Sequence, residues 1–269
     1  MSTMSKILLS EIWIYPVKSF GGISLHHSEV LIKGLRHDRR WMLIDYQNNF
    51  LTQREFPQMA LFKMRYEENS FTVSYKGDLI TLDPDAPTLS TGIRAKIWND
   101  EVEVAEVSEF HSQWISERMG MQCKLVSFPE KNTRPVRPGF NVNKEDVSLA
   151  DGFPYMIIGQ ASLDELNSRM SAGLPMNRFR PNFVFTGTPA FQEDSWKHIR
   201  IGNVDFAVMK PCERCVLTTV DQITGEKGKE PLATLSTFRN FDHKVLFGQN
   251  MVALNEGTIE LNAEITLIK

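Results

Sequence analysis

The sequence is poor in cysteine, with Cys123, Cys212 and Cys215 as the only three among 269 residues. So few cysteines do not make the disulfide framework of a small secreted domain. They indicate a reducing compartment, and we expect a cytoplasmic protein. No stretch approaches the ~20 consecutive apolar residues of a membrane-spanning helix, so no membrane span is predicted. The formal net charge of −3 at pH 7 argues against nucleic acid as a partner.

Three common signatures of enzymes are also missing from the chain. It contains no glycine-rich loop ending in Gly-Lys-Ser/Thr, no Gly-x-Ser-x-Gly turn and no Gly-x-Gly-x-x-Gly after a strand. These absences argue against a P-loop nucleotidase, an α/β-hydrolase and a Rossmann dinucleotide enzyme.

What the sequence does contain is a succession of short apolar, β-branched stretches with few helical patterns. Strands are predicted at Ile7–Tyr15, Ile23–Leu31, Arg40–Asp45, Phe50–Thr52, Leu61–Tyr66, Phe71–Tyr75, Leu79–Leu82, Ala95–Trp98, Glu101–Val107, Phe183–Thr186, Ile199–Ile201, Val204–Met209, Val216–Val220, Met251–Leu254 and Thr258–Ile268. This pattern predicts a mainly β protein with some α structure and a barrel-like core.

Three helices are predicted among these strands. The first covers Ser108–Met119, with Phe110, Trp114 and Ile115 as its apolar face. The second begins at Ser162, which forms a capping box with Glu165. The third covers Pro231–Phe238.

The cysteine pair in Cys212-Glu213-Arg214-Cys215 is the most reactive candidate in the chain. Arg214 lies between the two sulfurs in sequence and would favour an ionised thiol. A structural zinc site needs four ligands, and the six histidines show no matching second pair. A redox dithiol normally opens a helix, whereas a strand is predicted here. A metal or metal-cofactor ligand, a redox pair and two structural cysteines all remain open, and Cys123 is expected to be a small core residue.

Basic loops at predicted strand edges form a second group of candidates. Lys18-Ser19 precedes two glycines, Arg36, Arg39 and Arg40 precede Trp41, and Arg180 and Asn182 precede a strand. Lysine and arginine suit phosphate oxygens, and asparagine amides suit the edge of a heterocycle. Each loop alone is typical of a solvated turn, but three together favour an anionic ligand. Turns at Asp151-Gly152-Phe153 and at Asn250 could contact the same ligand.

These segments together resemble one protein family. The matching pieces are Tyr15–Ser19, Gly34–Arg36 with Asp38, Arg39 and Trp41, Ala161–Leu163 with Leu166–Arg169, Phe179–Asn182, Glu193–Trp196, Cys212–Asp221 and Phe247–Gly248. In this order they resemble the MOSC family, and in particular the subgroup of amidoxime-reducing components, which carry an N-terminal MOSC β-barrel region.

The resemblance implies a MOSC β-barrel core of the pyruvate-kinase-barrel type and a smaller N-terminal β-barrel region with a few helices. It places the N-terminal region at residues 5–126 and the MOSC domain at residues 127–269, with residues 1–40 able to join the core barrel.

The resemblance also implies a molybdenum cofactor, the molybdopterin complex of molybdenum. Cys215 would be the metal ligand and the catalytic residue. The cofactor-binding residues would be Lys18, Ser19, Arg39, Asp151, Gly152, Phe153, Arg180, Asn182, Glu213, Arg214 and Asn250. Because Glu213 would repel an anionic cofactor, Arg214 or a lysine is expected to offset its charge.

The activity implied by the resemblance is reduction of N-hydroxylated compounds, such as amidoximes, hydroxylamines and N-hydroxylated bases. An iron–sulfur domain needs four cysteines, and none follows Cys215, so an external electron donor of the ferredoxin, flavodoxin or cytochrome b5 type is implied. One alternative is a carrier that holds the cofactor or its sulfur without turnover, and another is a zinc or dithiol protein.

Overall fold

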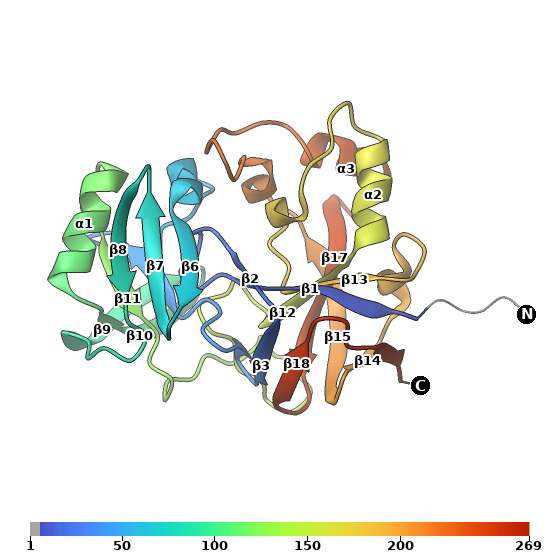
Figure 1. Cartoon of the computed structure of the whole chain (residues 1–269), viewed down its shortest axis with the longest axis horizontal. Coiled ribbons are helices and arrows are strands. Elements are labelled where there is room, and N and C mark those ends of the chain that lie inside the picture. Colours follow the sequence, from blue (N-terminus) through green and yellow to red (C-terminus); the bar gives the residue numbers. More distant parts are fainter. Residues whose placement is uncertain (1–5, 269) are drawn as a thin grey trace, which may run out of the picture.

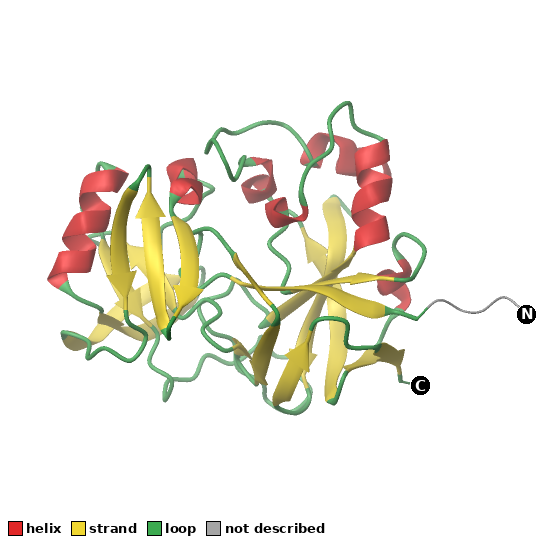
Figure 2. Ribbon diagram, viewed as in Figure 1, coloured by secondary structure: helices red, strands yellow, loops and turns green. Residues whose placement is uncertain are grey.

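The computed structural model describes residues 6–268 and shows a mainly β protein. Figure 1 shows the large curled sheet on one side of the molecule and two smaller sheets on the other. Figure 2 shows helices at the periphery of both parts. The mainly β class with some α structure is therefore confirmed, with a curled half-barrel as its main sheet.

The curled sheet has nine strands in the order β19-β14-β15-β17-β12-β13-β1-β2, and β16 pairs with β17 at its side. These strands are β1 (Leu8–Ile14), β2 (Ile23–Leu25), β12 (Tyr155–Gly159), β13 (Phe183–Thr186), β14 (His198–Ile201), β15 (Val204–Glu213), β16 (Asn240–Phe241), β17 (Lys244–Ala253) and β19 (Ile265–Leu267). The pairing is antiparallel except between β12 and β13. Strand β1 pairs with β13 and β2, so the start of the chain belongs to the sheet formed mostly by its second half. The division at residues 126 and 127 stays a prediction.

Three smaller sheets complete the β structure. They are β5-β11-β10-β9, β6-β7-β8 and β18-β3-β4. Their strands are β3 (His27–Leu31), β4 (Gly34–Leu35), β5 (Trp41–Ile44), β6 (Lys63–Glu67), β7 (Ser70–Tyr75), β8 (Asp78–Leu82), β9 (Ser90–Ile97), β10 (Asp100–Glu106), β11 (Lys124–Ser127) and β18 (Gly257–Glu260). The alternating burial of β7 shows why this stretch is a strand with one face in the core.

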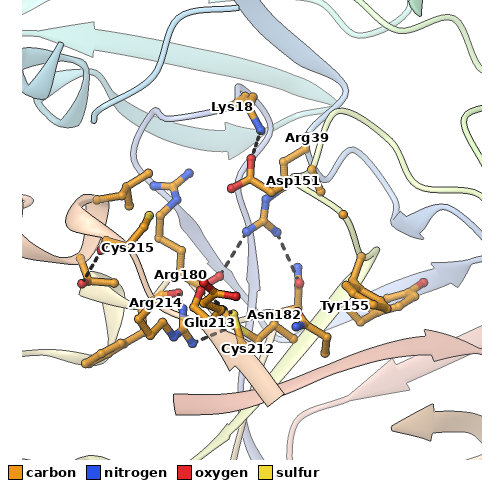
Figure 3. A pocket seen from close by; sticks show the side chains of 18 of the residues that line it. Lys18, Arg39, Asp151, Tyr155, Arg180, Asn182, Cys212, Glu213, Arg214 and Cys215 are labelled. Atoms are coloured by element: carbon orange, nitrogen blue, oxygen red, sulfur yellow. Dashed lines mark hydrogen bonds and ion pairs between the residues drawn. The ribbon is translucent and has the colours of Figure 1, made fainter. Parts of the chain in front are cut away.

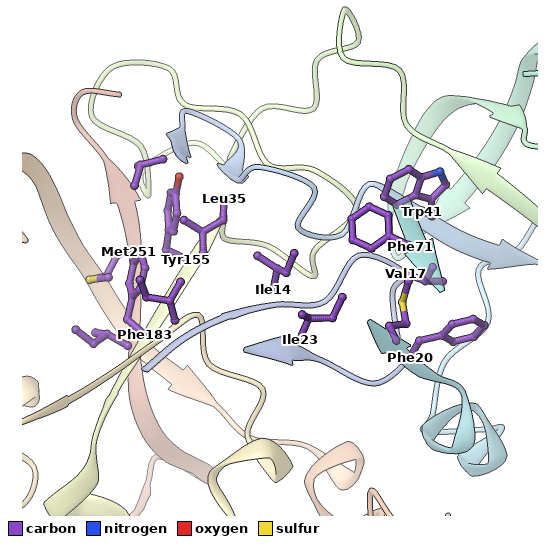
Figure 4. Close-up of a cluster of buried hydrophobic side chains, with 14 of the residues drawn as sticks. Ile14, Val17, Phe20, Ile23, Leu35, Trp41, Phe71, Tyr155, Phe183 and Met251 are labelled. Carbon is purple, nitrogen blue, oxygen red and sulfur yellow. The ribbon is translucent and has the colours of Figure 1, made fainter. Parts of the chain in front are cut away.

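One hydrophobic core runs through both parts of the molecule. Ile14 and Phe183 pack under the curled sheet, while Trp41 and Phe71 pack between the smaller sheets, and all four belong to one continuous cluster. Figure 4 shows Val17 beside Trp41 and Phe71, with Ile14 between this group and Phe183. The loop after β1 therefore crosses from one part to the other through the core, which fixes the position of Lys18 and Ser19.

The helices are α1 (Glu109–Met119), α2 (Gln160–Ser168) and α3 (Leu232–Phe238). Four short 3-10 helices are η1 (Pro57–Leu61), η2 (Met176–Arg178), η3 (Gln192–Ser195) and η4 (Val216–Thr219). Within residues 6–268, none of the helices is both long and apolar enough to cross a bilayer.

Helix α1 agrees with the prediction at its ends and differs from it on its face. Ser108 caps it by accepting a hydrogen bond from the His111 backbone, and Gly120 ends it with φ 69°. Ile115 is buried as predicted, but Phe110 is 68% exposed, so the predicted stripe of Phe110, Trp114 and Ile115 is wrong at its first member. Met119 packs in the core instead.

Two further local predictions are wrong. Helix α2 begins at Gln160, and the Ser162 hydroxyl donates to the Glu193 carboxylate, so there is no capping box with Glu165. Residues Val216–Thr219 form η4 where a strand was predicted, because the Cys215 carbonyl accepts from Thr218 and closes a tight turn. At Ser162 a tertiary contact replaces the predicted cap, and at Val216–Thr219 a local turn replaces the strand that the β-branched residues predicted.

Candidate functional site

A pocket of about 430 Å3 opens where the ends of several core strands meet the loops of the smaller sheets (Figure 3). All the site residues predicted from the sequence line it, namely Lys18, Ser19, Arg39, Asp151, Gly152, Phe153, Arg180, Asn182, Glu213, Arg214, Cys215 and Asn250. They come from six separate segments of the chain, so the fold brings together what the sequence keeps apart. Their individual roles stay predictions.

One side of the pocket, which we call the cation wall, consists of Lys18, Ser19, Arg39 and Arg180. The two guanidinium groups lie on the Tyr15 ring, with their Cζ atoms 4.3 Å (Arg39) and 4.2 Å (Arg180) from its centroid. Tyr15 is fully buried, and burial raises its pKa well above the usual range, so its hydroxyl stays protonated and donates to the Pro181 carbonyl. The cation wall is thus held from behind by a neutral aromatic ring.

Asp38 connects the cation wall to its neighbours. Its carboxylate accepts from the Tyr15 backbone at 2.7 Å, from Arg39 Nη1 at 2.5 Å and from the Asn182 side chain at 3.0 Å. Arg39 Nη2 also donates to the Arg180 carbonyl at 3.1 Å. Asp38 is buried, and these donors supply its carboxylate with hydrogen bonds. The same hydrogen bonds hold Arg39 and Asn182 toward the pocket.

The backbone of the cation wall adopts uncommon conformations. Ser19, Arg39 and Arg180 have φ values of 68°, 50° and 56°, in the left-handed region that favours glycine. Such positions cost about 1–2 kcal/mol each and persist where the surrounding structure enforces them. Here the strain turns three side chains of the same wall toward one cavity.

Lys18 is almost fully buried at the edge of this wall. Its ammonium donates to the Leu149 carbonyl at 2.9 Å and to Asp151 at 2.6 Å. Burial lowers the Lys18 pKa to about 8, although Asp151 opposes the shift. Burial in turn acts to raise the pKa of Asp151, but Lys18 and Arg54 outweigh it and hold that pKa well below the usual range. Both groups of the pair are therefore charged at neutral pH.

Arg180 is the second buried cation of the wall. Burial lowers its pKa to about 10, and its Nη1 donates to the Phe20 carbonyl at 2.6 Å. A desolvated guanidinium facing a cavity favours an anionic ligand, because such a ligand restores the interactions that water provided.

A second group of lining residues, which we call the thiol wall, consists of Cys212, Glu213, Arg214 and Cys215 at and just after the end of β15. Figure 3 shows the two cysteines at different places along this wall. Burial raises the pKa of Cys212, which packs beside an apolar cluster. The Cys215 side chain is half-buried and lines the pocket just before η4.

The cation that contacts Cys215 is different from the one predicted. Arg214 donates to the carbonyls of Phe247 and Phe179 at 2.8 and 2.9 Å. Arg54 Nε donates to the Cys215 sulfur at 3.2 Å instead. The expectation that Arg214 acts on the thiol is therefore replaced for Cys215 by an arginine from the first part of the chain.

Gly248 permits this placement of Arg214. Its φ is 78°, and an added Cβ would lie 2.6 Å from the Ile158 side chain and 3.3 Å from Arg214 Nη2. A side chain at this position would press on both neighbours. The glycine therefore allows β17 to run close behind the thiol wall.

The predicted repulsion by Glu213 is offset by a lysine. Lys244 Nζ lies 3.4 Å from the Glu213 carboxylate, and both side chains are about half-exposed. Asn250 lies on the neighbouring strand β17 and donates to the Pro211 carbonyl at 3.4 Å.

Cys212, the other member of the cysteine pair, also lines the pocket. Further lining residues were not among the predicted site residues: Arg54, Ala150, Tyr155, Met156, Phe179, Lys210, Leu217 and Thr218. Arg54 is the most consequential, since it contacts both Cys215 and Asp151. The available signal was a basic residue just after the predicted strand Phe50–Thr52, which is the same kind of position that drew attention to Lys18.

The charges and donors of the pocket limit what it can hold. Its cationic side chains outnumber its carboxylates, with Lys18, Arg39, Arg54, Arg180, Lys210 and Arg214 against Asp151 and Glu213. Within residues 6–268, no three His, Cys, Asp or Glu side chains gather as a metal site. A soft metal at Cys215 would therefore need ligands from a bound anionic cofactor, and the residues present fit a cofactor that carries its own sulfur ligands and a phosphate.

Two family models match the chain. The MOSC N-terminal beta barrel domain matches residues 6–122, and the MOSC domain matches residues 144–266. Mitochondrial amidoxime-reducing component 1 is 33% identical in Mus musculus and 34% identical in Homo sapiens, over 97% of this chain and 82% of each relative. Molybdenum cofactor sulfurase of Oryza sativa subsp. japonica is 30% identical over 91% of this chain and 32% of its own length.

Proposed function

The chain belongs to the MOSC family, and on that premise we propose that it is a molybdenum-cofactor oxidoreductase that reduces N-hydroxylated compounds. The family and the relatives give it a role related to the molybdenum cofactor. The more specific activity is supported by its similarity to proteins named amidoxime-reducing components over nearly the whole chain.

The observation that carries the proposal is the pairing of two walls in one pocket. The cation wall binds the phosphate of the cofactor through Lys18, Ser19, Arg39 and Arg180. The thiol wall presents Cys215, whose thiolate completes the metal's sulfur ligands. A cationic cradle and a half-buried thiol in one pocket suit a ligand with an anionic end and a soft-metal end.

The other predicted residues take the space between the walls. Asp151, Gly152, Phe153 and Asn182 contact the pterin, and the Asn182 amide is already oriented by Asp38. Glu213 and Arg214 would lie beside the metal, and Asn250 would contact the cofactor. Lys244 neutralises Glu213, which lowers the repulsion of an anionic cofactor.

When bound, the molybdenum cofactor would supply two-electron redox chemistry at the pocket. The net reaction would use two electrons and two protons to convert an N–OH group to N–H and release water. The chain holds the thiolate, binds the phosphate and shapes the access to the metal. The electrons come from an external donor of the ferredoxin, flavodoxin or cytochrome b5 type.

We also propose a domain organisation and a compartment. Residues 5–126 form the N-terminal region and residues 127–269 the MOSC domain, with β1 and β2 adding the first residues to the MOSC sheet. All three cysteines are free, which supports a reducing, cytoplasmic environment.

The test is chemical analysis followed by turnover. Protein from a cofactor-competent host should contain molybdenum and pterin and should convert benzamidoxime to benzamidine with reduced viologen as donor. Zinc without molybdenum or pterin would contradict the proposal and favour a zinc or dithiol protein.

The second candidate function is a carrier of the cofactor or of its sulfur. The similarity to molybdenum cofactor sulfurase over 91% of this chain favours it. Fully loaded protein that leaves benzamidoxime unchanged, while an active relative converts it in the same assay, would support the carrier against the reductase.

A further inference from the structure

Arg54 links the two walls of the pocket from outside both of them. It follows β5 and the Phe50–Thr52 stretch, and its side chain is 17% exposed. Its Nε donates to the Cys215 sulfur at 3.2 Å, and its Nη2 donates to Asp151 at 2.7 Å. Asp151 in turn pairs with Lys18 at 2.6 Å, so the thiol is connected through Asp151 to the cation wall.

The position of Arg54 is fixed on several sides. Its Cζ lies 4.6 Å from the Trp98 ring centroid, and Trp98 Nε1 donates to Asp151 at 3.2 Å. The Arg54 backbone N–H donates to the Thr52 hydroxyl at 3.2 Å, and its carbonyl accepts from Lys227 at 2.6 Å. A guanidinium held at both ends of its side chain can impose a direction on its partner.

We propose that Arg54 is a positioning residue that orients the Cys215 sulfur and tunes a metal bound to it. This inference rests on the proposed molybdenum-cofactor function. A hydrogen bond to a metal-bound thiolate draws electron density away from the metal, which favours the reduced state and raises the reduction potential. Arg54, from the loop after β5, thereby acts on the sulfur that would bind the metal. The pocket residues from the curled sheet do not supply this contact.

The same chain offers a closely matched control. Arg118 also stacks on a tryptophan, with its Cζ 3.9 Å from the Trp114 centroid, and its Nη2 pairs with Asp78 at 2.8 Å. Its side chain is 18% exposed. Among residues 6–268, its Nε has no hydrogen-bond partner. Arg54 and Arg118 therefore share burial, stacking and an ion pair. Arg54 bonds to sulfur, whereas Arg118 donates to the Trp114 carbonyl at 2.9 Å and lies near Glu117.

The experiment compares wild type, Arg54→Met, Arg54→Lys and Arg118→Met after expression in a cofactor-competent host. Molybdenum and pterin are measured first, and the midpoint potential of the metal is then followed by an EPR-monitored redox titration. We expect Arg54→Met to disfavour the reduced metal by about tenfold, which is about 59 mV lower for a one-electron couple. Arg54→Lys keeps the positive charge but lacks the planar guanidinium with its several donors, so its midpoint potential should shift less. The midpoint potential of Arg118→Met should match that of wild type.

The outcomes separate this inference from the function on which it rests. Wild-type protein without molybdenum and pterin overturns the proposed function and this inference with it. Loaded wild type and loaded Arg54→Met with equal potentials overturn this inference alone.

The inference can also be tested if the Arg54 variants do not bind molybdenum and pterin. The Cys215 side chain is then compared in crystal structures of cofactor-free wild type and Arg54→Lys. An unchanged sulfur position overturns the inference, and a changed rotamer supports it.

Discussion

The cation wall and the thiol wall face the same cavity but differ in burial and in backbone conformation. Lys18, Ser19 and Arg180 are each less than 10% exposed, and two of them have left-handed backbones. Cys215 is half-buried in an ordinary extended conformation, with φ −121° and ψ 177°. The cation wall therefore consists of buried groups, some with strained backbones, whereas the thiol wall presents an accessible sulfur.

This difference separates two tasks. A desolvated cation lowers the stability of the folded protein and becomes favourable when an anion pairs with it. The cation wall therefore lowers the free energy of unfolding and raises the affinity for an anionic ligand. The thiol makes few contributions to packing, so its removal should leave the fold intact. Substitutions on the two walls should therefore change stability and binding in different proportions.

The largest expected effect is at the thiol wall. Cys215→Ala should lower molybdenum content and benzamidoxime reduction by more than about 100-fold, because the metal loses its protein ligand. The midpoint of thermal unfolding should stay within about 2 °C of wild type, since a half-buried side chain is removed. Elemental analysis, the viologen assay and calorimetry measure the three quantities.

The matched control for this substitution is Cys212→Ala. Cys212 packs beside an apolar cluster, and burial raises its pKa, so we expect Cys215 and not Cys212 to be the ligand. The variant should keep its molybdenum. Equal loss of metal in both cysteine variants would contradict the assignment of the ligand to Cys215.

A smaller effect is expected at the cation wall as a function of pH. The Lys18 pKa is about 8 in the folded chain, against an ordinary value of 10.5. Between these values the unfolded chain binds more protons, so wild-type stability gains a rising contribution as pH increases from 8 to 10.5. Lys18→Met lacks this contribution. The unfolding midpoint of the variant minus that of wild type should therefore decrease as the pH rises from about 8 to 10.5. Parallel profiles of the two proteins would refute the assigned burial cost of Lys18.

The smallest effect should distinguish strain from binding. Ser19→Gly relieves a left-handed backbone, and the gain offsets the entropy cost of glycine, so the free energy of unfolding should be unchanged or up to about 1 kcal/mol higher. Loss of the hydroxyl should lower cofactor retention by less than about tenfold. Denaturant unfolding and pterin fluorescence after gel filtration measure the two effects.

Ser24→Gly is the control for Ser19→Gly. Ser24 lies exposed in β2, and the glycine should cost about 0.5–1 kcal/mol there. Equal destabilisation by both glycines would show that the backbone of Ser19 stores no strain.

Much of the fold could be predicted because local patterns agree with it. Phe183–Thr186 is a strand with the predicted bounds, and α1 starts after Ser108 and ends at Met119 as expected. Predictions from local sequence were wrong where a residue far away in the sequence determines the local structure. Ser162 is bound to Glu193, which lies on a separate 3-10 helix, and no pattern near Ser162 reveals that contact.

The site was predictable to the extent that its residues occur in recognisable segments. Lys18, Arg180 and Cys215 lie in such segments, and they converge on one pocket. Arg54 lies in none, and its importance arises from contacts with Asp151 and Cys215 that are created only by folding. The left-handed backbone of Arg180 was equally invisible, since arginine carries no turn signal.

The pairing of β1 with β13 has a consequence for the synthesis of this protein. Leu8 leaves the ribosome well before its partner Thr186. At about 5–20 residues per second, the delay is on the order of 10–40 seconds. During this time β1 can pair with β2 on one edge, but its other edge lacks β13. A nascent-chain chaperone that covers Leu8–Ile14 would therefore have its greatest effect on yield before the second half of the chain is translated.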